Sequence, residues 1–151
     1  MLNDIYNQRI LELAGNIPRL GRLEDAQATA RAHSKLCGST VTVDLAMADG
    51  RVSDYAQDVK ACALGQAAAS IVGRHVIGAT AEELRTLRDQ VRAMLKDKGA
   101  PPNGAWADVA VLEPVRDYKA RHASTLLAFE AAAQAASEIE AKAQPETVAT
   151  A

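Results

Sequence analysis

The chain has 151 residues, 48% hydrophobic and 24% charged, which fits a single globular domain and excludes a fibrous or disordered protein. Its formal charge is -2 and no part of it holds a concentrated Lys/Arg block, so we expect no nucleic-acid binding. Charged residues are spaced regularly through Met1 to Asn16, and no apolar run reaches transmembrane length. We therefore expect a cytoplasmic protein that is not associated with a membrane.

The amino-terminal part is predicted to hold a short helix and then strands. Residues 2–14 place apolar side chains at helical spacing, with Asn3 or Asp4 as the cap. Between Ala26 and Met47 the pattern changes, and apolar residues alternate with polar or small ones. Alternation with a period of two is typical of half-buried strands, so this stretch is predicted to hold two of them.

A hairpin and an alanine-rich helix are predicted next. Asp49-Gly50 suits a type I′ turn, because both central positions of that turn need a positive φ. The turn would lead into a third antiparallel strand over residues 51–59. The stretch from Cys62 to Gly73 is rich in alanine and predicts a closely packed helix.

The remaining part is predicted to be helical with one loop. Thr80 and Glu83 form a capping-box pattern at the start of an amphipathic helix. The Pro-containing run Gly99 to Gly104 predicts a loop, and Trp106 beyond it is interpreted as a core residue. Pro114 is predicted to open the last helix.

Strands followed by helices, without alternation of the two, predict an α+β fold in which helices cover one face of a small three-stranded antiparallel sheet. We expect one domain over residues 1–140, with the last helix ending between Glu140 and Pro145. Residues 141–151 are expected to form a disordered carboxyl-terminal tail.

The two cysteines, Cys37 and Cys62, are predicted to be reduced thiols, because nothing in the sequence indicates export. Their number alone favours small buried hydrophobes, since a metal site needs about four ligands. Their positions indicate reactivity instead. Gly38 lets the backbone turn sharply beside Cys37, and Cys62 opens a helix, where free amides and the helix dipole stabilise a thiolate.

The sequence around these cysteines resembles a known family. Ala-Cys-Ala-Leu-Gly-Gln-Ala-Ala-Ala-Ser begins at Ala61, and Cys62 follows Cys37 by 62 minus 37, or 25, positions. With a strand-hairpin-strand between the cysteines, this pattern resembles the U-type iron-sulfur cluster scaffolds: IscU, SufU and the amino-terminal domain of NifU. The resemblance covers residues 2–136. It implies a scaffold or carrier protein, not an enzyme, whose partners are a cysteine desulfurase and apo iron-sulfur proteins.

Two ligand positions depart from that family. The third cysteine of the family lies in a run that resembles Arg121 to Ala131, where this chain has Ser124, or Ala123 if the register shifts by one. The spacing from Cys62 resembles the SufU branch. Ser39 stands where the family has an aspartate. The resemblance therefore implies a degenerate ligand set that keeps Cys37 and Cys62.

Several functions fit this degenerate set. The first is a scaffold that holds a labile iron-sulfur cluster or zinc between Cys37 and Cys62, with His122 as a candidate third ligand or as an ordinary solvent-facing histidine. Two chains in a homodimer would supply four thiolates to one cluster. The alternatives are a SufU-like sulfur relay with Cys62 as the persulfide acceptor, and a pseudo-scaffold that binds no cofactor.

Overall fold

Three antiparallel strands form one sheet in the order β1-β2-β3, in a computed structural model that describes residues 6–36 and 38–143. The strands are β1 (Ala28–His33), β2 (Thr40–Ala48) and β3 (Arg51–Lys60). Asp49 and Gly50 join β2 to β3 with φ of 56° and 78°, as a type I′ turn requires. The predicted strands and their hairpin are therefore confirmed.

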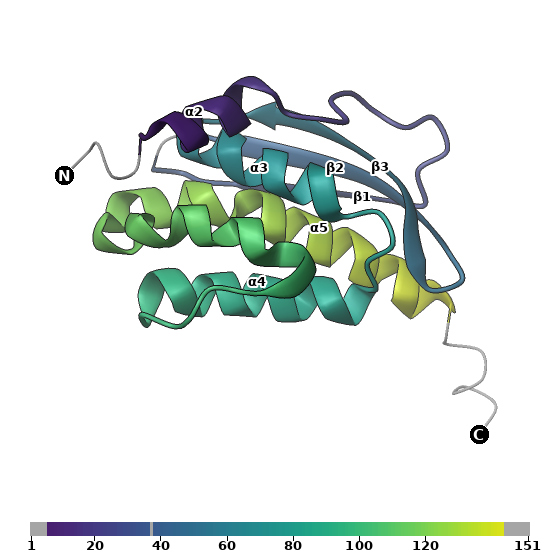
Figure 1. Cartoon of the computed structure of the whole chain (residues 1–151). Helices are drawn as coiled ribbons and strands as arrows, with labels where there is room; N and C mark the ends of the chain where they lie inside the picture. The colour runs from purple at the N-terminus through teal and green to yellow at the C-terminus, as the bar shows by residue number, and fades with distance from the viewer. Residues whose placement is uncertain (1–5, 37, 144–151) are drawn as a thin grey trace.

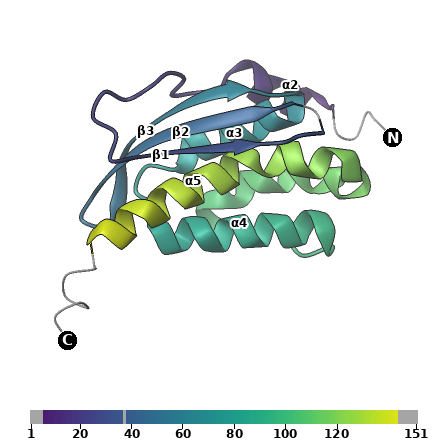
Figure 2. The ribbon, with the colours of Figure 1, turned by 180° about the vertical axis from the view of Figure 1, so that it is seen from behind.

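The helices cover one face of this sheet in two layers (Figures 1 and 2). Helices α3 (Ala63–His75) and α5 (His122–Ala143) contact the strands, and α4 (Ala81–Lys96) packs against α5 on the side away from the sheet. Helix α2 (Gln8–Gly15) packs on α3. The predicted α+β architecture is confirmed. No helix in the described ranges is long and apolar enough to span a membrane.

The core lies between the sheet and α3 and α5. Val41, Val43 and Leu45 are fully buried on the inner face of β2, opposite the alanines of α5. Alanine is both a strong helix former and small, so α5 approaches the sheet closely. Tyr55 and Phe129 are buried in this core as well, and burial raises the pKa of the Tyr55 hydroxyl above the usual range.

The segment between α2 and β1 is tied to β3 by Gln57. The side-chain amide of Gln57 is fully buried, and Nε2 donates to the carbonyl oxygens of Pro18 at 3.0 Å and Ala69 at 3.1 Å. Its main chain accepts from Gly21 N and donates to Arg19 O, both at 2.9 Å. One residue of β3 therefore joins the amino-terminal segment to both the sheet and α3.

A buried carboxylate holds the same segment on the outer face of the sheet. Asp44, on β2, is 1% exposed and accepts from Arg22 Nε at 2.6 Å, Leu23 N at 3.0 Å and Thr29 Oγ1 at 2.6 Å. The bond from Arg22, assisted by the hydroxyl and the amide, lowers the pKa of Asp44 to about 2 despite its burial. The carboxylate is therefore ionised at neutral pH.

Two predicted helix starts were wrong. Helix α2 begins after Asn7, whose side chain accepts from Ile10 N at 3.0 Å, and the expected caps Asn3 and Asp4 lie outside the described residues. Pro114 does not open the last helix: it lies inside the 3-10 helix η1 (Gly104–Asp117). A second 3-10 helix, η2 (Lys119–Arg121), follows, so α5 starts eight residues after the proline.

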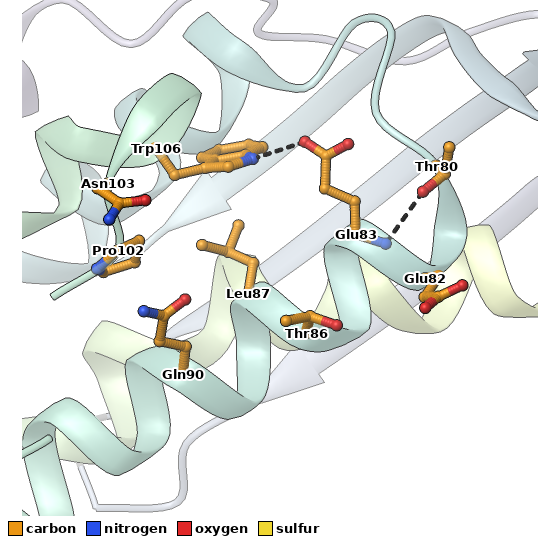
Figure 3. A pocket seen from close by; sticks show the side chains of 9 residues that line it. All are labelled: Thr80, Glu82, Glu83, Thr86, Leu87, Gln90, Pro102, Asn103 and Trp106. Carbon is orange, nitrogen blue, oxygen red and sulfur yellow. Dashed lines mark hydrogen bonds between the residues drawn. The ribbon is translucent and has the colours of Figure 1, made fainter. Parts of the chain in front are cut away.

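The capping box predicted for α4 is half formed. Thr80 Oγ1 accepts from Glu83 N at 3.0 Å, as predicted. The Glu83 carboxylate turns to the indole of Trp106, whose Nε1 donates to it at 2.9 Å (Figure 3). Trp106 is 5% exposed, which confirms it as a core residue. Its buried N–H needs an acceptor, and this bond joins η1 to the start of α4.

The carboxyl-terminal helix α5 ends at Ala143, within the expected interval. Residues 141–143, assigned above to the tail, are helical. The rest of the proposed tail, residues 144–151, lies outside the described residues.

Candidate functional site

Cys62 occupies the junction between β3 and α3. It is the N-cap residue of α3, with an extended backbone conformation (φ -67°, ψ 172°), and its side chain is half-buried. Gln66, four residues on, donates from Nε2 to Ala61 O at 2.9 Å and from its main chain to Cys62 O at 2.9 Å. The glutamine of the motif therefore fixes the strand-to-helix junction that presents the thiol.

Ser124 lies directly against that thiol. It sits in the first turn of α5, is 1% exposed, and accepts a hydrogen bond from Cys62 Sγ at 3.4 Å across 62 positions of sequence. Its own hydroxyl donates to the main-chain oxygen of Arg121 at 3.2 Å. A polar chain thus runs from the Cys62 thiol through the Ser124 hydroxyl to a backbone carbonyl. Of the two registers considered, the structure brings Ser124 to Cys62.

Gly65 allows this close approach of α3 and α5. A β-carbon on Gly65 would lie 2.7 Å from Ala61 Cβ and 3.2 Å from Ser124 O. Both distances are shorter than ordinary van der Waals contact, so a side chain here would push the start of α5 away from Cys62. Sequence analysis noted the small residues of α3 as packing residues but did not connect them with the site.

The first cysteine cluster is described only in part, because Cys37 lies outside the described residues. Its neighbour Gly38 has a φ of 68°, and Ser39 is 2% exposed, with its main-chain oxygen accepting from Ser34 N at 2.9 Å. The β2–β3 ladder ends with Thr40 paired to Lys60. The chain entering β2 and the chain leaving β3 towards Cys62 therefore lie at the same end of the sheet.

His122, the candidate third ligand, makes its described contacts with η1. Its ring is 5% exposed and Nε2 lies 3.1 Å from the carbonyl oxygens of both Val115 and Arg116. This nitrogen must therefore carry a proton and act as a donor. Two positions along an α-helix correspond to a rotation of about 200°, so His122 and Ser124 project to nearly opposite sides of α5. The alternative reading of His122 as a solvent-facing residue was wrong.

The other two histidines also have protein partners. His33 Nδ1 lies 2.9 Å from Thr40 Oγ1, across the β1–β2 pair. His75, in the last turn of α3, lies 2.8 Å from a carboxylate oxygen of Asp108.

The described ranges 6–36 and 38–143 contain no cluster of three or more His, Cys, Asp or Glu side chains able to hold a metal ion. Among the predicted ligands, Cys62 is the soft anionic donor that these ranges provide, and Ser124 beside it is a neutral hydroxyl. A cavity of about 360 Å³ between α4 and η1, lined by polar residues together with Leu87, Pro102 and Trp106, includes none of the predicted ligands (Figure 3).

Fold and site define a class of protein: a small α+β domain with a cysteine at the exit of its last strand and the start of a second helix packed against that cysteine. Residues 5–143 match the family model described as the NifU-like N terminal domain. The chain therefore belongs to the family of NifU-like N-terminal domains, and the family predicted from its cysteine motifs is confirmed.

Relatives of known structure or name agree with this assignment. The crystal structure of the amino-terminal part of a nitrogen-fixing NifU-like protein from Brucella abortus is 60% identical, with a TM-score of 0.91, covering 93% of this chain and 98% of that one. The iron-sulfur cluster assembly scaffold protein IscU of Thermotoga maritima is 27% identical over 135 residues, covering 89% of this chain and 94% of the relative.

The fold is also that of a SUF-system scaffold. The crystal structure of a putative iron-sulfur cluster assembly scaffold protein from Fervidobacterium islandicum AW-1 has a TM-score of 0.81 at 19% identity. It covers 89% of this chain and 98% of that chain. This likeness supports the three-stranded α+β fold.

Proposed function

We propose that this protein is an iron-sulfur cluster assembly scaffold or carrier with a reduced ligand set. The observation that carries the proposal is the contact of 3.4 Å between Cys62 Sγ and Ser124 Oγ, which supports residue 124 as the counterpart of the family's third ligand. The named IscU and NifU-like relatives support the scaffold class. The protein would hold a cluster or zinc as cargo and would not turn over a substrate.

Cys62 and Cys37 are the proposed thiolate ligands. Cys62 Sγ is half-buried at the start of α3, where it contacts the Ser124 hydroxyl. When Cys62 ionises, the Ser124 hydroxyl can rotate to donate to the thiolate instead of to Arg121 O. Serine thus stabilises a free thiolate at this site but adds no soft anionic ligand for iron or zinc.

The contacts of His122 make it a weaker candidate for a metal ligand than the sequence alone indicated. To ligate a metal through Nε2 it would have to release two carbonyl oxygens of η1 and leave them buried without a donor. We therefore propose that the ligands that Cys37 and Cys62 do not supply come from a partner protein or from a second copy of the chain.

A proposed cysteine desulfurase would supply the sulfur and apo iron-sulfur proteins would receive the cluster. In the sulfur-relay alternative, the Cys62 thiolate attacks the outer sulfur of a persulfide on the desulfurase. A new S–S bond forms at Cys62, the S–S bond on the desulfurase breaks, and its cysteine leaves as a thiolate. This alternative needs only the one thiol that the described site presents.

The proposal predicts that Ser124→Cys raises cluster and zinc binding. The new thiol would stand within reach of Cys62, so the variant gains a third soft ligand without a new backbone position. We expect at least about tenfold tighter zinc binding in competition with a chromophoric chelator. Anaerobic cluster reconstitution should also give a higher yield than for the wild type.

Ser137→Cys, on the same helix, is the matched control and should leave both measurements unchanged. Adding Ser39→Asp to Ser124→Cys should strengthen binding further if residue 39 supplies the carboxylate that the family carries there. Equal zinc affinity in the wild type, Ser124→Cys and Ser137→Cys would contradict the proposed cargo site. Persulfide on Cys62 after incubation with a desulfurase and cysteine, without bound metal, would favour the relay.

A further inference from the structure

Four cationic side chains line one cavity between the carboxyl end of α4 and the amino end of α5. The cavity, of about 810 Å³, is lined by Lys96, Lys98, Arg116, Asp117, Lys119 and His122, above the buried Leu95. We refer to it as the basic pocket. The whole chain has a formal charge of -2, so four cations beside two carboxylates, Asp117 and the Arg116 partner Glu113, are a local concentration and not a consequence of overall composition.

Arg116 brings an unused donor to the basic pocket. Its Nη2 donates to Gly99 O and to Glu113 Oε2, both at 3.0 Å. Its Nε is buried and has no hydrogen-bond partner within the described ranges. Buried guanidinium donors are normally satisfied, so Arg116 is held at this cavity with one donor unused.

Lys98 occupies a backbone position that favours glycine. Its φ is 56°, immediately after the α4 C-cap residue Asp97, and the next residue, Gly99, donates from its main chain to Ala93 O at 3.0 Å. A left-handed residue after a helix end is usually glycine, because a β-carbon is strained there. The chain therefore carries a lysine at a conformational cost, and its side chain lines the basic pocket.

We propose that the basic pocket is a docking surface for a carboxylate-rich segment of a partner protein. Lysines are point charges on flexible stems, and they adapt to carboxylates spread along a peptide. The lining contains no Trp, Tyr or Phe ring on which a nucleobase could stack, and the His122 ring is 5% exposed. Its volume exceeds what one inorganic anion needs and suits several side chains.

The docking surface lies one short helix away from the thiol site. Lys119 of η2 lines the basic pocket, and Arg121, at the other end of η2, accepts the hydroxyl of Ser124 through its main-chain oxygen. A partner bound at the basic pocket would thus be held next to the element that positions Ser124. The inference depends only on charge and hydrogen bonding, so it stands whether or not Cys62 binds a cluster.

The test is an NMR titration of the full chain with an octapeptide of glutamate, and with tripolyphosphate in a parallel arm. We expect peptide-dependent shifts confined to residues 95–99 and 115–122, with a Kd of about 0.1 to 1 mM that rises with added salt. Lys96→Gln/Lys119→Gln should weaken binding about tenfold. Lys60→Gln/Lys142→Gln removes the same charge at other places and should bind as the wild type does.

Lys98→Gly distinguishes a loss of peptide binding from a loss of stability. It removes one cation of the basic pocket but relieves the backbone at a position of positive φ, so binding should weaken severalfold while the thermal midpoint is unchanged or higher. Each of four results would overturn the proposal: no shifts, shifts outside these residues, equal weakening in both double variants, or tighter binding of tripolyphosphate than of the peptide.

Discussion

An oxygen atom at position 124 changes what the neighbouring thiol can do. Cys62 donates a hydrogen bond to Ser124, and the Ser124 hydroxyl donates one to Arg121 O. A serine hydroxyl keeps its proton near neutral pH, so the pair carries at most one negative charge where two thiolates would carry two. If Cys62 ligates a metal as we propose, the weaker charge would lower the affinity for it.

At the residue scale, Gly65→Ala should damage both stability and the site. The added methyl group would stand 2.7 Å from Ala61 Cβ and 3.2 Å from Ser124 O, so α3 and α5 would have to separate. We expect a loss of about 1 to 3 kcal/mol in the free energy of unfolding, as for other overpacked cores. Urea unfolding monitored by circular dichroism measures it.

Gly15→Ala is the control for this substitution. A β-carbon on Gly15 meets no atom within 4 Å, so alanine there should be neutral or should stabilise the fold by about 0.4 to 1 kcal/mol. Similar unfolding midpoints for Gly65→Ala and Gly15→Ala would show that α3 and α5 do not depend on the missing side chain.

At the element scale, local patterns predict the strands well and the helix starts less well. Alternation and Asp49-Gly50 define β2, β3 and their turn because both signals act between neighbouring residues. Asn7 and Pro114 show where this fails. Any of several polar residues can cap a helix, and proline is also accommodated in a 3-10 helix, so packing decides between the alternatives.

The candidate site shows the same limit. The motif predicts that Cys62 opens a helix, and the aligned run predicts that Ser124 is the matching position, which the contact between them supports. The role of Gly65 and the partners of His122 were missed. Both depend on how α5 lies against α3 and η1, and that arrangement joins residues about sixty positions apart or follows from an irregular 3-10 segment.

The buried carboxylate of Asp44 should make the attachment of residues 22–23 to the sheet depend on pH. Its folded-state pKa, about 2, is below the value of about 3.9 expected in the unfolded chain. Its contribution, roughly 2 kcal/mol, is therefore complete above about pH 4 and is lost as the pH falls towards 2. Asp44→Asn should be less stable than the wild type at pH 7.

The measurement is urea unfolding of the wild type and Asp44→Asn between pH 7 and pH 2. The difference in unfolding free energy between them should shrink below about pH 4, because the wild type alone loses the ionised group. Asp54→Asn, on the adjacent strand but exposed, is the matched control. A difference that stays constant down to pH 2 would show that the charge of Asp44 does not stabilise the fold.

At the scale of the whole molecule, the reduced ligand set predicts that one cluster is shared by two chains. Each chain offers two cysteines, and iron-sulfur clusters in proteins are commonly held by four. We expect two chains per reconstituted cluster in the wild type, measured by light scattering together with iron and sulfide analysis. Ser124→Cys should shift the cluster-loaded protein towards one chain per cluster.

Two results test whether one cluster is shared by two chains. Ser137→Cys adds a thiol to the same helix without facing Cys62, so it should keep the stoichiometry of the wild type. If a single wild-type chain binds the whole cluster, the missing ligands do not come from a second chain. The prediction of a cluster shared by two chains would then be wrong.

The position of α5 at the end of the described chain bears on how the protein is made. Helix α5 covers β1 and β2 and supplies Ser124, yet it is the last of these elements to leave the ribosome. Until then the inner face of β2, with Val41 and Val43, lacks its cover, and Cys62 has no partner at position 124. We expect a nascent chain to be unable to take up cargo until α5 has been synthesised and has packed against α3 and the sheet.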